Sequence, residues 1–234
     1  FLKKILRFIY YKLLFIKTDG IFCIGKKAQN YYFKFTKNSY YVPYSINPYK
    51  INLKNKIKKI NFIFVGQLID RKSILEIISA FKLLIKKFPK CKLSIIGTGK
   101  YKKTCLKNSK KIKQITFYDF RKQKFIKKKL NESHVFLQPS KYDGWSVATM
   151  QAMNAGLAII GTKSTNCISD YIKHLKNGYI CDPTSQSIFK GMMFYCFNFN
   201  KLKDHMKKNK KIYDRSLMNS TRLSQKVIKI FSNN

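Results

Sequence analysis

Residues 60–84 read INFIFVGQLIDRKSILEIISAFKLL, and this stretch decides the fold class. An apolar run from Ile60 to Val65, interrupted only by Asn61, ends at Gly66, where a polar loop begins. The apolar residues that follow, from Ile74 to Ile85, recur every three or four positions, which predicts an amphipathic helix. A short buried strand followed by a helix is the repeating unit of a parallel β-sheet.

The same unit recurs along the chain. Further apolar runs occupy residues 92–96, 115–118, 134–138, 157–160 and 178–181, and a Lys-rich helix is expected over 125–130. This pattern predicts an α/β fold, a Rossmann-like parallel sheet with helices on both faces. Ligands of such sheets bind beyond the carboxyl ends of the strands. One cleft should therefore be lined by the loops that begin at Gly66, Gly97, Tyr118, Pro139 and Gly161.

Two flanking segments do not fit this repeat. Before residue 60 the pattern predicts strands over 19–25 and 40–43 with a helix over 26–33 between them, too little to enclose a sheet core. We therefore expect residues 1–49 to be the end of a truncated N-terminal domain and the start of a linker. Residues 50–201 are expected to form the Rossmann-like domain, and residues 202–234 a helical tail rich in lysine.

Lysine dominates the charge of the chain. The 234 residues include 49 Lys and Arg against 10 acidic residues, which gives a formal charge of +39, yet only five of the basic residues are Arg. Proteins that read nucleic acid favour the planar Arg side chain. Ile, Asn, Phe and Tyr are abundant together with Lys, as AT-rich codons dictate. We therefore assign the charge first to genome composition and second to an anionic partner, and nucleic acid is not the expected partner.

Few features of the sequence indicate a metal site or a membrane segment. The six cysteines include no C-x-x-C pair and no His at ligand spacing, so we expect buried thiols, a reducing cytoplasm and no metal site. His134 is expected in the core, and His174 and His205 on the surface. No apolar run is long enough to span a membrane. Residues 1–16 predict a basic amphipathic helix, which either packs on the rest of a domain or docks on a membrane surface.

The loop from Gly66 to Ser73 has the chemistry of an oxyanion site. Arg71 and Lys72 stand where a helix begins, so fixed cations, backbone N–H groups and the helix dipole coincide, which suits a diphosphate. An ordinary turn with solvated bases is the alternative. The segment Gly97-Thr-Gly99 is too short for a dinucleotide-binding fingerprint and predicts a tight turn.

A second loop is richer in polar groups. Asp143 follows the fourth strand, and Gly144 and Trp145 can offer backbone N–H groups at the start of the next helix. Gln151 lies about two turns along that helix. Asp143 and Gln151 are thus placed to hold two hydroxyl-bearing groups of one ligand. The alternative makes Asp143 a helix cap and Gln151 a surface residue.

Three motifs in this order resemble the retaining GT-B glycosyltransferases of family 4, which use nucleotide sugars. They are FVGQLIDRK at 64–72, Pro139-Ser140, and DGWSVATMQAMNAG at 143–156. The resemblance covers about residues 60–183 and continues upstream into the last part of that family's acceptor domain. It implies an enzyme of polysaccharide biosynthesis that transfers a sugar to a glycan or lipid-linked acceptor with retention of configuration, without cofactor or metal.

The resemblance also implies roles for individual residues. Lys72 matches the lysine on the donor diphosphate, where it and Arg71 would stabilise the leaving group. Asp143 and Gln151 fall at the two acids of the E-x7-E motif, which hold the sugar hydroxyls and the ribose. The other implied donor contacts are Gly66, Gln67, Gly144, Trp145, Thr149 and Met150, with Gly97, Gly99, Tyr118 and Phe120 in the loops that face the nucleobase.

The chain departs from the family pattern at several positions. Gln67 stands where many members have Arg, Asp143 and Gln151 both replace Glu, and Asp119 replaces a usual Gly. Most of the acceptor domain, with its catalytic His, is missing from the sequence. We therefore expect this chain to bind a nucleotide but to transfer sugar poorly or not at all, in the cytoplasm and with peripheral contact at the inner membrane face as an option.

Two other function classes stay open. One is a non-catalytic relic of such an enzyme that binds nucleotides or polyanions, although the chain has no RNA-binding aromatic motif. The other is a different GT-B activity. Sugar-nucleotide epimerases lack the spacing from Asp143 to Gln151, and we identify no lysine for the pyridoxal group of a phosphorylase.

Overall fold

The computed structural model describes residues 2–49 and 59–232. Its centre is a six-stranded sheet in the order β5-β4-β3-β6-β7-β8, in which every neighbouring pair is parallel. The strands are β3 (Asn61–Val65), β4 (Lys92–Ile96), β5 (Ile115–Tyr118), β6 (Val135–Gln138), β7 (Ala158–Gly161) and β8 (Gly178–Ile180). All six lie on the apolar runs of the sequence, so the predicted fold class is confirmed.

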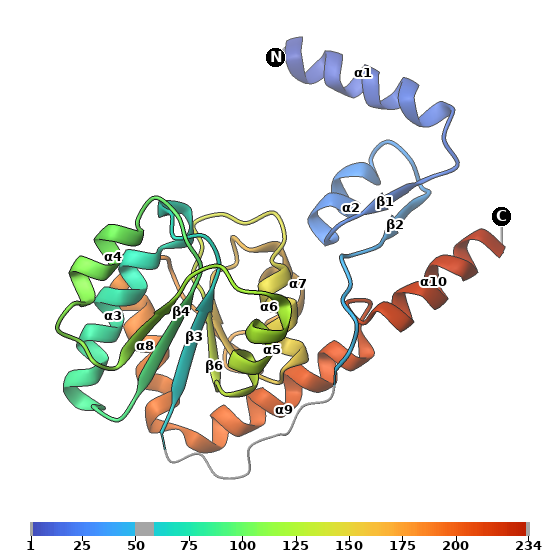
Figure 1. The fold of residues 1–234 in the computed structure, drawn as a ribbon. Coiled ribbons are helices and arrows are strands. Elements are labelled where there is room, and N and C mark those ends of the chain that lie inside the picture. Colours follow the sequence, from blue (N-terminus) through green and yellow to red (C-terminus); the bar gives the residue numbers. More distant parts are fainter. Residues whose placement is uncertain (1, 50–58, 233–234) are drawn as a thin grey trace.

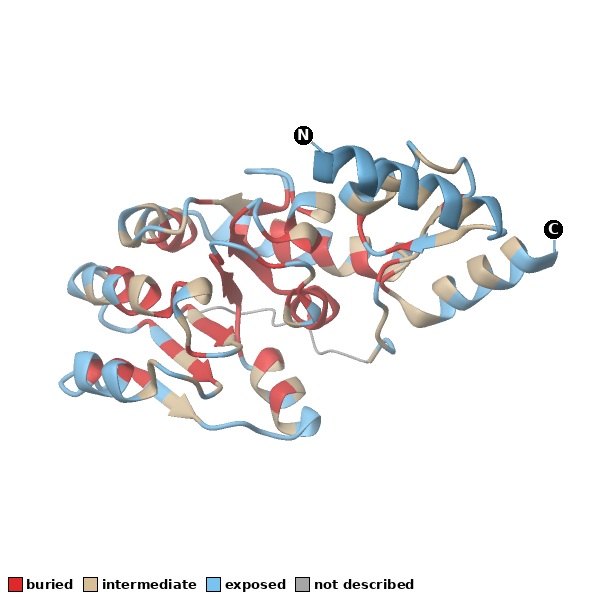
Figure 2. Ribbon diagram, turned by 90° about the horizontal axis from the view of Figure 1, so that it is seen from above, coloured by how far each residue is buried: buried red, intermediate tan, exposed pale blue. Residues whose placement is uncertain are grey.

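Helices cover both faces of this sheet (Figure 1). They are α3 (Ile74–Lys87), α4 (Lys102–Ser109), α5 (Gln123–Asn131), α6 (Val147–Asn154), α7 (Asn166–Tyr171), α8 (Ser185–Phe197) and α9 (Phe199–Arg215). One apolar core lies between the sheet and α3, α4 and α8, and the second lies between the sheet and α5, α6 and α7. The buried residues of Figure 2 follow these two layers. The helix α4 was not predicted, because its sequence, KKTCLKNS, has almost no apolar face.

The helix α9 joins the two cores and changes the predicted domain boundary. Its Leu202 and Met206 pack in the first core, and its Tyr213 packs in the second. The predicted boundary after residue 201 therefore falls inside a helix that belongs to the main domain. The expected single tail helix is also divided, because the chain turns between Arg215 and Ser220 before α10 (Ser220–Ser232) begins.

The N-terminal segment forms a small separate layer (Figure 1). Its parallel strands β1 (Ile21–Cys23) and β2 (Ser39–Tyr41) flank the helix α2 (Lys26–Tyr32), as predicted. Two hydrogen bonds tie this layer to α7: Lys26 N–H donates to Asp170 Oδ2 at 2.9 Å, and the hydroxyls of Tyr41 and Tyr171 are 2.8 Å apart.

The predicted amphipathic helix at the start of the chain is α1 (Leu2–Ile16). It contacts the segment around α2 through the rings of Tyr11 and Phe15, which lie 5.2 and 6.4 Å from the ring of Phe35. None of its residues is buried, and its other large apolar side chains are exposed (Figure 2). In the part of the chain that the structure describes, no helix has the length and apolarity that crossing a membrane requires.

The register brings the chemistry-bearing loops to one edge of the sheet. Val65, Ile96 and Tyr118, the last residues of β3, β4 and β5, are aligned with one another across the strand pairs. Gln138 at the end of β6 is paired in the same way with Gly161 at the end of β7. The loops that follow these strands therefore meet at the carboxyl edge, as expected for a parallel sheet.

Candidate functional site

The loops after β3 and β6 are bound to each other, because these two strands are neighbours in the sheet. Lys141 N–H donates to the carbonyl of Arg71 at 2.9 Å, and the Arg71 guanidinium donates back to the carbonyl of Tyr142 at 2.8 Å. At the exposed rim, Lys141 also pairs with Asp70 at 2.8 Å. The first predicted oxyanion loop and the loop that carries Asp143 thus form one unit.

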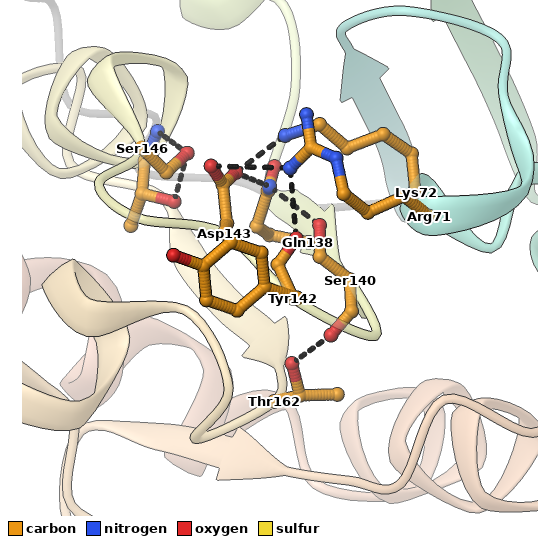
Figure 3. A network of polar contacts seen from close by, with 9 residues as sticks. Arg71, Lys72, Gln138, Ser140, Tyr142, Asp143, Ser146 and Thr162 are labelled. Atoms are coloured by element: carbon orange, nitrogen blue, oxygen red, sulfur yellow. Dashed lines mark hydrogen bonds and ion pairs between the residues drawn. The ribbon is translucent and has the colours of Figure 1, made fainter. Parts of the chain in front are cut away.

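Asp143 is the centre of this unit (Figure 3). Its Oδ2 forms an ion pair with Lys72 Nζ and accepts a hydrogen bond from Gln138 Nε2 at 3.0 Å. Its Oδ1 lies 3.4 Å from an Arg71 guanidinium nitrogen. The side chains of Lys72 and Asp143 are only 12% and 10% exposed, so this is a largely desolvated pair. The residues predicted to hold the diphosphate and the sugar therefore contact each other.

A cavity of about 460 Å³ adjoins this unit and is lined by residues after β3, β4 and β5. It includes five residues of the predicted donor site: Gly66, Gln67, Gly97, Gly99 and Phe120. Gly97 has a φ of +145°, and a Cβ there would lie 1.9 Å from the Gly66 carbonyl oxygen. Only glycine fits at this approach. The backbones after β3 and β4 are thus in close contact here and form one wall of the cavity.

The predicted nucleobase loop after β5 reaches the cavity through Phe120 and not through Tyr118. The Phe120 side chain lines the cavity, and the residue is 80% exposed. Tyr118 is the last residue of β5, and its ring lies 5.1 Å from that of Phe125 in α5. Asp119, between them, pairs with Lys102, whose hydrogen bond and charge lower the pKa of that carboxyl.

The N-cap of α6 is not Asp143, the residue of the alternative interpretation. Ser146, not Asp143, is the N-cap: its hydroxyl accepts a hydrogen bond from Thr149 N–H at 3.2 Å. The backbone N–H groups of Gly144 and Trp145 have no hydrogen-bond partner among the described residues. Gly144 is exposed and Trp145 is half-buried, and the assignment of these two N–H groups to an anion stays a prediction.

Three predicted donor contacts are less accessible than expected. Thr149 and Met150 are fully buried, and the Met150 sulfur accepts the indole N–H of Trp145 at 3.0 Å. Gln151 is 8% exposed, and its amide donates to Gln123 Oε1 at the start of α5 at 2.7 Å. Its side chain is therefore not the free surface residue of the alternative interpretation. A ribose at this position would have to take over the hydrogen bond to Gln123.

Two buried polar residues were missed or misplaced by the sequence analysis. Gln138 closes an apolar run, and its 1% exposed side chain lies beneath Asp143. The sequence signal for Gln138 was a polar residue at the carboxyl end of an otherwise apolar strand.

His205 was expected at the surface but is fully buried, with Nδ1 2.9 Å from the Tyr195 hydroxyl and Nε2 3.1 Å from the Leu175 carbonyl. His134 is buried, as predicted, and accepts a hydrogen bond from Asn61 N–H.

The donor set at the carboxyl edge suits an anion. It consists of Arg71, Lys72, the N–H groups of Gly144 and Trp145 and the glycine-lined cavity. Among the described residues, no three His, Cys, Asp or Glu side chains converge as a metal site would require. The arrangement can neutralise a diphosphate and can place hydroxyl groups beside a carboxylate.

Comparison with known proteins extends these observations. An uncharacterized glycosyltransferase of Haemophilus influenzae is 25% identical over 152 residues, which are 62% of this chain and 43% of that protein. The amylovoran biosynthesis glycosyltransferase AmsK of Erwinia amylovora is 27% identical over 147 residues, which are 58% of this chain and 36% of that protein. The chain thus spans less than half the length of these curated relatives.

Solved structures share the fold at low sequence identity. The pneumococcal O-GlcNAc transferase GtfA, in complex with UDP and GlcNAc, superposes with a TM-score of 0.79 at 17% identity, over 96% of this chain and 47% of GtfA. HepE of Anabaena, in complex with UDP and glucose, gives 0.74 at 13% identity, over 93% and 64%. The C-terminal domain of LpcC, a group 1 glycosyl transferase of Francisella tularensis, gives 0.61 at 21% identity, over 65% and 83%.

These likenesses agree with a match that covers most of the chain. The family model described as Glycosyl transferases group 1 matches residues 47–212, which include all six strands of the main sheet and both loops of the site. The chain therefore belongs to the group 1 glycosyl transferases.

Proposed function

We propose that this chain is the donor-binding half of a retaining family 4 glycosyltransferase, which transfers a sugar from a nucleoside-diphosphate sugar to a glycan or lipid-linked acceptor. The donor diphosphate binds Lys72 and Arg71 and the free N–H groups of Gly144 and Trp145. The nucleobase lies in the cavity between Gly97 and Phe120. No metal or other cofactor takes part in this binding mode.

One observation carries the proposal: Lys72 and Asp143 converge at the carboxyl edge, beside a cavity walled by close-packed glycines. In this arrangement Lys72, the cation for the leaving group, is in direct contact with Asp143, the acceptor for sugar hydroxyls. The spacing from Asp143 to Gln151, which resembles E-x7-E, supports the retaining mechanism. The names of AmsK, GtfA and HepE support a nucleotide-sugar donor and an acceptor in glycan assembly.

Calorimetric titration with UDP, GDP and ADP tests the proposal. We expect one nucleotide to bind the wild-type chain and Lys72→Ala to weaken that binding at least about tenfold, because a charge-assisted contact to phosphate is lost. Lys86→Ala, an exposed lysine at the far end of α3, is the matched control and should bind as the wild type does. Equal affinities for Lys72→Ala and the wild type would refute the assigned role of Lys72.

Polyanion binding is the second candidate, and one surface feature favours it. A groove of about 750 Å³ between α9 and the loop before β8 is lined by six cations: Lys173, Lys176, Lys201, Lys208, Lys211 and Arg215. Only Lys208 has an ion-pair partner among the described residues, Asp204. This groove contains none of the donor-site residues, so the two functions can be separated by mutation.

A second basic groove, of about 610 Å³ between α3 and α4, offers a matched control. Single-stranded RNA is titrated against two triple variants, one with Gln at residues 201, 208 and 211 and one with Gln at residues 82, 86 and 107. A loss confined to the first variant favours a specific polyanion site. Equal losses in both variants show that the lysine-rich surface binds without a defined site, with the salt dependence of counterion release.

A further inference from the structure

Gln138 occupies the floor of the candidate site, at the last position of β6. Its side-chain amide donates two hydrogen bonds, to Ser140 Oγ at 2.9 Å and to Asp143 Oδ2 at 3.0 Å (Figure 3). The residue is 1% exposed, so both bonds are shielded from water. Its own carbonyl oxygen, Oε1, is buried and has no hydrogen-bond partner among the described residues.

The orientation of this amide is set by Asp143. A carboxylate can only accept hydrogen bonds, so the reversed amide would place Oε1 against Asp143 and lose that bond. The orientation that satisfies Asp143 leaves Oε1 without a donor, which costs free energy in a buried position. The hydrogen bond to the carboxylate therefore determines how Gln138 lies.

Gln138 differs in charge from the other two groups that contact Asp143. Lys72 and Arg71 are cations, and a diphosphate in the cleft attracts both of them. The Gln138 amide is neutral and buried, so a diphosphate does not compete for it. When Lys72 turns to the phosphates, Gln138 remains the group that fixes one oxygen of the Asp143 carboxylate and leaves the other free to accept sugar hydroxyls.

We infer that Gln138 is a positioning residue for donor-sugar recognition, which acts through Asp143 and not on the nucleotide. This inference rests on the proposed function of the site. It separates two parts of the donor: Gln138 affects the affinity for the sugar ester relative to the free diphosphate, whereas Lys72 affects both.

Affinities for matched ligand pairs test the inference. The 234-residue chain is titrated with UDP, GDP and ADP and with the glucose ester of each, and the ratio of the two dissociation constants is recorded for the pair that binds. Gln138→Met keeps the length of the side chain and removes both donors. We expect its affinity for the free diphosphate to stay within about twofold, and the ratio to move about tenfold against the sugar ester, as for loss of a hydrogen bond to a charged group.

Two further variants make the result specific. Gln138→Glu keeps the size but places an acceptor against Asp143, and it should move the ratio further than Gln138→Met does. Gln151→Met, at the predicted ribose position, is the matched control: it should weaken both ligands of a pair equally and leave the ratio unchanged.

A double-mutant cycle with Asp143→Ala decides whether Gln138 acts through that carboxylate. If it does, Gln138→Met changes the ratio in the wild type and changes nothing in the Asp143→Ala background. Equal effects in both backgrounds, equal weakening of both ligands, or loss of cooperative unfolding in both Gln138 variants would overturn the inference. Failure of the wild type to bind any of the nucleotides would overturn the proposed function, and the inference with it.

Discussion

Lys72 and Asp143 form an ion pair across a separation of 71 residues and join the loops that follow β3 and β6. Both side chains are largely withdrawn from water, and Arg71 and Gln138 are the other groups that contact the carboxylate. The pair joins the two loops of the candidate site. In the proposed binding mode, a diphosphate would compete with the Asp143 carboxylate for the Lys72 ammonium.

The pair also predicts a stability effect. Lys72→Met should lower the free energy of unfolding by about 1–3 kcal/mol, less than for a fully buried pair, because Arg71 still faces the Asp143 carboxylate. The double variant Lys72→Met with Asp143→Leu should regain part of this loss, because no buried charge is left unpaired. Urea unfolding of the three proteins measures both values, and a double variant less stable than Lys72→Met would contradict the explanation.

The cavity wall should not tolerate a side chain at Gly97. Gly97→Ala places a Cβ against the Gly66 backbone at a φ of +145°, so we expect a loss of about 2 kcal/mol or more of unfolding free energy. Gly144→Ala is the matched control, because a Cβ there meets only the Tyr142 hydroxyl, at 3.9 Å. It should change stability by no more than about 0.5 kcal/mol. Thermal unfolding compares the two variants. Equal stability of both would show that the loops of Gly66 and Gly97 can move apart at little cost in free energy.

His205 should make stability depend on pH. Burial lowers the pKa of its imidazole, so the folded state keeps it neutral while the unfolded chain takes up a proton near its ordinary value of about 6.5. The unfolded state then binds more protons as the pH falls below that value. Stability should therefore be complete above about pH 7 and decline toward pH 5.

Two histidine variants check this assignment. His205→Gln should flatten the pH profile of the melting temperature between pH 7 and 5, although it also loses the contact with Tyr195. His174→Gln, at an exposed histidine, is the control for the substitution itself. If the melting temperature of His205→Gln depends on pH as that of the wild type does, another titrating group causes the dependence.

The cysteines should be unreactive in the folded protein. All six are buried, which shields them from reagents. Burial raises the pKa of Cys105 to about 11 and that of Cys181 to about 12, whereas the hydrogen bond with Cys196 lowers the pKa of Cys91. A thiol reagent should label six groups rapidly in denaturant and almost none without it. Fast labelling of the native chain would show that a core residue is more accessible than the structure allows.

Much of the fold was readable from the sequence because the signal is local. The apolar run before Gly66 and the helical spacing after Ile74 need no tertiary information, and the carboxyl-edge rule then places Lys72 and Asp143 in one cleft. The prediction did not extend to their mutual contact. Each was assigned to a different part of the donor, and only the adjacency of β3 and β6 brings them together.

The errors share a physical cause, which is that tertiary contacts decide which face of an element is buried. His205 lies in a lysine-rich helix, yet it packs against Tyr195 on the preceding helix. Tyr118 packs against Phe125 and is not among the residues that line the cavity. The contact of Gln138 with Asp143 was not predicted, because nothing in the local sequence shows that the carboxylate five residues later lies above this end of the strand.

The most direct test of the account is the effect of Asp143→Asn on two ligands, the free nucleoside diphosphate and its sugar ester. If Lys72 is shared between Asp143 and the phosphates, Asp143→Asn removes the competing carboxylate. The free diphosphate should then bind several-fold more tightly than it binds the wild type. The sugar ester should show no such gain in affinity, because the carboxylate proposed to accept its hydroxyls is lost. Asp70→Asn, which removes a carboxylate from an exposed pair in the same unit, should leave both affinities unchanged. Weaker binding of the free diphosphate to Asp143→Asn would contradict the account, because it would mean that the carboxylate supports Lys72 and does not compete for it.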